Sequence, residues 1–177
     1  MFRTILSVSL LVFSLALPVY GQQSTRADFE EFLGVMEGRY VCDIIWIADW
    51  PGVGGKEGDK VTGHANLEVA ADGNVLRGTF YGGNVTNTWI TVYDAAAKQI
   101  RFLTGSSGGT IWNGIIFKKN GNWVEVGTGG NPDGSKIEFN NTLTLSDNGR
   151  THHWSGESSI GGSPARSLED VCHRVSK

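Results

Sequence analysis

The sequence contains no hydrophobic run long enough to predict a helix that stays in a membrane. The apolar run at 5–17 begins two residues after Arg3 and is shorter than the roughly 20 residues that span a bilayer. A short apolar run between a basic residue and a small residue such as Gly21 is typical of a cleaved signal peptide. We therefore predict a signal peptide over 1–21 and a secreted or periplasmic mature domain over 22–177. A retained membrane anchor is the alternative.

Positive charge is also scarce. The chain has 15 Lys and Arg against 18 Asp and Glu, a net charge of −3, and removing Arg3 with the signal peptide changes −3 to −4. Proteins that bind nucleic acids usually present basic surfaces to the phosphates, so we predict no nucleic-acid partner. The remaining roughly 155 residues suit one domain.

Patterns that identify metal sites or catalytic sets are missing as well. The four histidines show neither helical nor zinc-type ligand spacing: His64, His152, His153 and His173. The segment 105–109 fits G-x-S-x-G around Ser107, but it joins two predicted strands, whereas a nucleophile elbow joins a strand to a helix. The acidic residues considered for proton transfer form no evident pair: Glu68, Glu125, Glu138 and Glu157. We predict no cofactor and name no catalytic residue.

Proline and cysteine are rare, whereas glycine is abundant. Four prolines accompany 25 glycines, about twice the usual share of glycine, which indicates many tight turns. The two cysteines, Cys42 and Cys172, lie near the two ends of the mature chain. An oxidising compartment favours a disulfide between them; two unrelated buried thiols are the alternative.

One stretch has helical periodicity. Its apolar residues recur at i, i+3, i+4 and i+7: Phe29, Phe32, Leu33 and Met36. Thr25 and Asp28 have the spacing of an acidic variant of the capping box. We predict a short amphipathic helix that packs one face against the rest of the domain as a plug.

The rest of the mature chain alternates with a period of two, most clearly at 136–146. Such alternation predicts strands with one face in the core. Asn-Gly and Asp-Gly turn sequences separate these segments, for example at 72–74 and 147–149, and they favour hairpins. We predict an all-β, antiparallel up-and-down barrel of about ten strands. Closure would bring the first and last strands together and make Cys42 and Cys172 neighbours.

Several segments resemble known barrels. The segment 32–40 resembles the short helix and Gly-x-Trp start of lipocalin-like (calycin) barrels, with Tyr40 in place of the usual Trp. The segments 71–81, 92–98 and 112–114 resemble those of bacterial secreted barrel proteins of uncharacterised function. The resemblance implies a barrel with an end plug and an interior pocket.

Polar residues on otherwise apolar faces are candidates for the interior. Asn113 alternates with isoleucines, and Asn141 alternates with Phe139 and Leu143; each amide either belongs to an internal network or meets a ligand. His152 and His153 point to opposite faces of one strand, and His152 shares its parity with Trp154. The complete set predicted to contact a ligand is Trp46, Phe80, Asn113, Phe139, Asn141, His152 and Trp154.

Three functions follow from this interior. The first is binding of a small apolar or amphipathic molecule. The second is an enzyme of the isomerase or cyclase type, with His152 as acid or base and therefore with a perturbed titration. The third is a structural or interaction module with a solid core, because small barrels are often filled by their own side chains. A resemblance to the nitrobindin-like branch of these barrels would imply haem held by His152; a hydrogen-bonded structural histidine is the alternative.

Overall fold

A computed structural model describes residues 22–50 and 55–177; the predicted signal peptide lies outside the described residues. The elements are α1 Arg26–Met36, β1 Gly38–Ile45, β2 Lys60–Ala70, β3 Val75–Gly82, β4 Val85–Asp94, β5 Gln99–Ser106, β6 Ile111–Lys119, β7 Asn122–Gly130, β8 Lys136–Ser146, η1 Asp147–Gly149, β9 Thr151–Ile160, β10 Ser163–Pro164 and β11 Leu168–Ser176. Within this part of the chain, no helix has both the length and the apolar character needed to cross a membrane.

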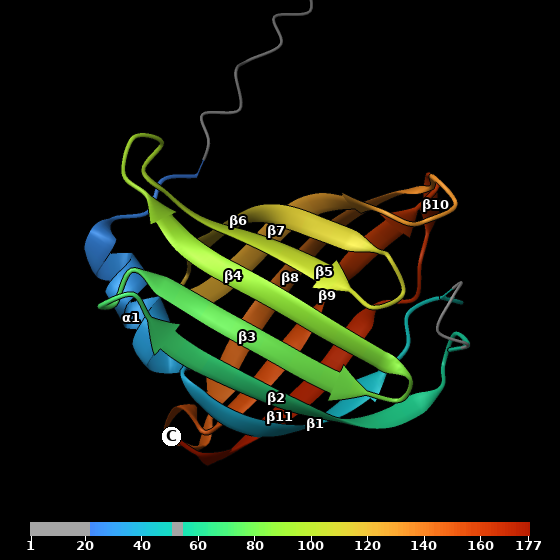
Figure 1. Cartoon of the computed structure of the whole chain (residues 1–177), viewed down its shortest axis with the longest axis horizontal. Helices are drawn as coiled ribbons and strands as arrows, with labels where there is room; N and C mark the ends of the chain where they lie inside the picture. The colour runs from blue at the N-terminus through green and yellow to red at the C-terminus, as the bar shows by residue number, and fades with distance from the viewer. Residues whose placement is uncertain (1–21, 51–54) are drawn as a thin grey trace, which may run out of the picture.

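The strands form one closed antiparallel barrel (Figure 1). Strands β1 to β9 each pair with the next, and β11 pairs with both β9 and β1, so ten strands complete the circle. The two-residue β10 also pairs with β9 and continues the line of β11. Closure removes the unpaired edges that an open meander would expose. The predicted all-β up-and-down barrel is confirmed, and it is compatible with a lipocalin-like fold.

A disulfide joins the first long strand to the last. Cys42 of β1 and Cys172 of β11 are register partners and are bonded to each other, at a sequence separation of 130. The predicted pairing is therefore confirmed. Crosslinking residues so far apart removes conformational freedom from the unfolded chain, for which the usual stabilisation is about 2–5 kcal/mol.

The helix α1 covers one end of the barrel, as predicted (Figure 1). Thr25 and Asp28 form the capping box: the Thr25 hydroxyl accepts from the Asp28 backbone N–H, and the Asp28 carboxylate accepts from the Thr25 backbone N–H. All four apolar residues with helical spacing are buried. Phe32 packs edge to face on Trp123 of β7, with ring centroids 5.1 Å apart. The helix thus contributes its apolar face to the barrel core.

Tyr40 fixes the other end of the helix. Its hydroxyl donates to the carbonyls of Val35 and Met36, at 3.2 and 2.9 Å, and accepts from Arg174 Nε at 2.8 Å. Arg174 also donates to the Val35 carbonyl. The last carbonyls of a helix have no partner inside it, so this cluster satisfies them. A phenol hydroxyl both donates and accepts, whereas an indole N–H only donates; the tyrosine therefore links the helix to the arginine as a Trp could not.

The alternation in sequence assigns the inward face correctly in one strand and wrongly in another. In β8, Phe139, Asn141 and Leu143 face the interior as predicted. In β6, Trp112 and every second residue after it face inward. Asn113 is exposed, and its amide Nδ2 donates to the Thr128 carbonyl at 3.4 Å. The assignment of Asn113 to the interior is therefore wrong. Isoleucines occupy both faces of β6, so apolar character does not distinguish them.

Candidate functional site

The barrel encloses a cavity of about 390 Å³. Its floor is formed by Phe32 and Met36 of α1, and it extends to Trp46, Trp50 and Gly108 beyond the far ends of the strands. Trp50 packs edge to face on Trp112, with ring centroids 6.0 Å apart. The volume lies within the range of pockets that hold small molecules, about 300–1,000 Å³. The interior is therefore not the solid core that the third function requires.

Glycines on the inward face make this volume possible, because aromatic rings lie close over them. A Cβ atom on Gly63 would fall 2.2 Å from the Phe80 ring, and one on Gly78 would fall 2.1 Å from the Trp89 ring. At Gly127 such a Cβ would fall 2.2 Å from the backbone oxygen of Asn113 and 2.7 Å from the tip of the Phe139 ring. Rings held against the wall leave the centre of the barrel empty. Part of the glycine excess is therefore not needed for turns and instead makes room for aromatic rings inside the barrel.

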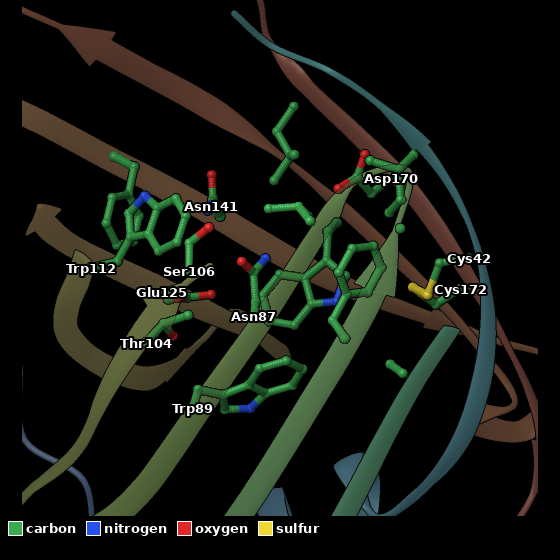
Figure 2. A pocket seen from close by; sticks show the side chains of 18 of the residues that line it. Cys42, Asn87, Trp89, Thr104, Ser106, Trp112, Glu125, Asn141, Asp170 and Cys172 are labelled. Atoms are coloured by element: carbon green, nitrogen blue, oxygen red, sulfur yellow. A yellow bond between two sulfur atoms is a disulfide. The ribbon is translucent and has the colours of Figure 1, made fainter. Parts of the chain in front are cut away.

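Polar groups from two pairs of neighbouring strands turn into this apolar space. Asn87 of β4 is the register partner of Ser106 of β5, and Glu125 of β7 is the register partner of Asn141 of β8. Figure 2 shows these four side chains directed into the cavity, near Trp112. The side-chain oxygens of Asn87 and Asn141 are buried and have no hydrogen-bond partner within the described part of the chain. Polar atoms in this state are rare in folded proteins.

Glu125 is the most unusual of these groups. The surface that it exposes lines the cavity. Among the described residues, no hydrogen bond or ion pair reaches its carboxyl group, and desolvation raises its pKa from the ordinary 4.5 to about 7. No Lys or Arg is found among the described residues that line the cavity. At neutral pH the group is therefore close to its midpoint of ionisation, with no positive charge built in beside it.

A second carboxyl group lies elsewhere in the same cavity. Asp170 of β11 accepts a hydrogen bond from the Ile45 backbone N–H at 3.2 Å. Desolvation raises the pKa of Asp170 to about 6, and the bond from Ile45 partly opposes this increase. Asp170 thus differs from Glu125 in having a partner within the protein. Figure 2 shows it at a distance from the cluster around Glu125.

His152 is buried near the floor, where its ring packs on Tyr40 with centroids 4.7 Å apart. Desolvation and the nearby positive charge of Arg174 lower its pKa to about 4. Its Nε2 atom has no partner within the described residues. The perturbed titration expected of a catalytic His152 is thus present, but its packing explains it without catalysis. The haem alternative fits poorly, because the described lining of the cavity holds the carboxyl groups of Glu125 and Asp170 and no Lys or Arg that could pair with the haem propionates.

Six of the seven residues predicted to contact a ligand line the cavity: Trp46, Phe80, Phe139, Asn141, His152 and Trp154. Sequence reasoning missed most of the polar residues that line the cavity: Asn87, Thr104, Ser106, Glu125 and Asp170. The period-two pattern of β7 contained one usable signal, because Glu125 lies two residues from the buried Trp123 and therefore on the same face of the strand. Without the register, however, a glutamate in an amphipathic strand is expected to face water.

Comparisons with known proteins add no assignment: the sequence matches no family model and no curated protein. Within the described residues, no three His, Cys, Asp or Glu side chains come together as a metal site. The function is therefore inferred from the cavity and from the groups that line it.

Proposed function

We propose that the protein binds a small amphipathic molecule inside its barrel. The observation that carries this proposal is the pair of unpartnered oxygens, Asn87 Oδ1 and Asn141 Oδ1, on residues that line a cavity of about 390 Å³. A buried polar atom without a partner costs about 1–3 kcal/mol. A ligand with an apolar body and a hydrogen-bonding group would fill the aromatic space and satisfy these atoms together.

The other hypotheses receive less support. A solid-core module would have no accessible interior volume. An isomerase or cyclase that uses His152 for proton transfer would need a group that titrates near the working pH, whereas the pKa of His152 is about 4. The resemblance of 32–40 to lipocalin-like barrels, which implies an interior pocket, agrees with binding.

Binding can be tested with N-phenyl-1-naphthylamine, a neutral apolar dye whose fluorescence rises in a dry environment. We expect saturable binding with one dye per chain. Ser106→Trp, which places an indole in the cavity, should abolish it. Leu103→Trp is the matched control, because Leu103 lies on the same strand and is 44% exposed on the outer surface. Absence of saturable binding, or equal loss in both folded variants, would contradict the proposal.

We further propose that the protein acts outside the reducing cytoplasm. The disulfide supports this location, because oxidising compartments favour such bonds. Cleavage after Gly21 predicts a mature N-terminus at Gln22. N-terminal sequencing of protein expressed in its own host tests the prediction; recovery of a chain that begins at Met1 would contradict it.

A further inference from the structure

We propose that the ligand is an organic cation, a protonated amine on an aromatic or aliphatic body, with Glu125 as its counter-ion. This inference rests on the proposed function and specifies the chemistry of the polar group. It follows from the charges that line the cavity and from the balance of donors and acceptors around Glu125.

The charges of the cavity are of one sign. Glu125 and Asp170 are carboxylic acids, the described lining contains no Lys or Arg, and the low pKa of His152 keeps that residue neutral near pH 7. A carboxylate or phosphate ligand would have no positive partner in a poorly solvated space and would be repelled by Glu125. Fatty acids and other organic anions are therefore disfavoured.

Hydrogen-bonding capacity also favours a donor. Glu125 and Asn141 are directly opposed on neighbouring antiparallel strands, an arrangement that usually places the Cβ atoms about 4.5–5.5 Å apart. The Asn141 oxygen has no donor, and neither has the ionised Glu125 carboxylate. Asn87 points its amide toward the same part of the cavity from β4 (Figure 2), and its oxygen also has no donor. A primary ammonium group supplies three N–H donors and accepts none.

The apolar wall suits such a ligand as well. Trp89, Trp112 and Trp154 line the cavity together with phenylalanines, and aromatic faces attract cations in addition to packing against apolar groups. Gly156, the register partner of Asn141 on β9, makes room for the amide itself: a Cβ atom there would fall 2.4 Å from Asn141 Oδ1.

Dye displacement with matched ligands tests the inference. 4-Phenylbutylamine, 4-phenylbutan-1-ol and 4-phenylbutanoate share one body and differ in charge, and decylamine, decanol and decanoate repeat the comparison on an aliphatic chain. At pH 8 and low salt, we expect the amine to displace the dye from the wild type at about tenfold lower concentration than the alcohol. The carboxylate should be the weakest of the three.

The variant Glu125→Gln keeps the shape of the side chain and removes its charge. We expect it to weaken the amine about tenfold while changing the alcohol less than about twofold. Glu138→Gln, on the exposed face of β8, is the matched control and should change neither. Circular dichroism checks that both variants fold; should Glu125→Gln fail to fold, the order of the three ligands on the wild type decides alone.

The failure of this inference is distinct from the failure of the proposed function. Dye binding without a preference for the amine on either body overturns the cation assignment and leaves the binding function standing. A preference for the carboxylate overturns it as well. An amine preference that survives in folded Glu125→Gln removes Glu125 as the counter-ion. Absence of dye binding overturns both proposals.

Discussion

The raised pKa of Glu125 predicts that replacing this residue by glutamine stabilises the protein, and that the gain depends on pH. The carboxyl group titrates near pH 4.5 when solvated and at about 7 in the folded protein. One pKa unit corresponds to about 1.36 kcal/mol, so the shift corresponds to about 3 kcal/mol of lost stability once both states are ionised. Glutamine does not titrate, and it removes this penalty.

The direction of this pH dependence follows from the order in which the folded and unfolded states lose the proton of Glu125. Below pH 4.5 both states hold the proton, and the group adds no penalty. Between pH 4.5 and 7 the unfolded chain releases its proton while the folded protein keeps it, so the free energy of unfolding falls as pH rises. Above about pH 7 the loss is complete. Glu125→Gln should therefore differ from the wild type by less than about 1 kcal/mol at pH 5 and by about 3 kcal/mol at pH 8.

Urea denaturation at pH 5, 6, 7 and 8, followed by tryptophan fluorescence, measures this difference. Asp170, whose pKa is raised to about 6, and His152, whose pKa is lowered to about 4, titrate in both proteins. Rising pH lowers the free energy of unfolding through Asp170, and falling pH lowers it through His152. Both effects cancel in the difference between the variant and the wild type if they are independent of position 125. Glu138→Gln controls for surface charge. A difference that stays constant from pH 5 to pH 8 would refute the reasoning.

Three other changes have defined outcomes. Replacing Cys42 and Cys172 together by alanine should lower the free energy of unfolding by about 2–5 kcal/mol, measured by urea denaturation against reduced and oxidised wild type; an unchanged midpoint would contradict this. Thr25→Ala, which removes the helix cap, should cost about 1 kcal/mol in the same assay without changing dye binding. Asn141→Leu should weaken displacement by the alcohol and the amine, whereas Asn113→Leu, on the outer surface, should leave both unchanged.

Local patterns were sufficient to predict the fold. The helix depends on a capping box and on the apolar spacing of a single amphipathic segment, and Thr25, Asp28 and Phe32 show both in sequence. The meander depends on hairpin turns between consecutive strands, which are also local. Once the strands follow one another around a circle, the first and last must meet, so the pairing of Cys42 with Cys172 followed from the same reasoning.

The site was less predictable because it depends on register and on the inward face of each strand. A one-residue error moves every side chain to the opposite face, as happened for Asn113. The meeting of Glu125 with Asn141 is set by the pairing of β7 with β8, which no local pattern specifies. The space in the cavity depends on inward glycines such as Gly78 lying beneath aromatic rings, and single-strand periodicity treats a glycine as neutral.

The combined variant Glu125→Gln/Asn141→Leu separates a binding site from a structural polar network. If the polar groups stabilise the barrel, removing two of them should lower the free energy of unfolding. Their oxygens have no partners in the described structure, so we expect the opposite: a gain of at least about 2 kcal/mol at pH 8, since a buried unsatisfied group costs about 1–3 kcal/mol and the carboxyl shift adds to it. Amine binding should be lost in the same protein. Stability that falls together with binding would show that Glu125 and Asn141 hold the barrel together, whereas stability that rises as binding disappears is the behaviour of groups retained for a ligand.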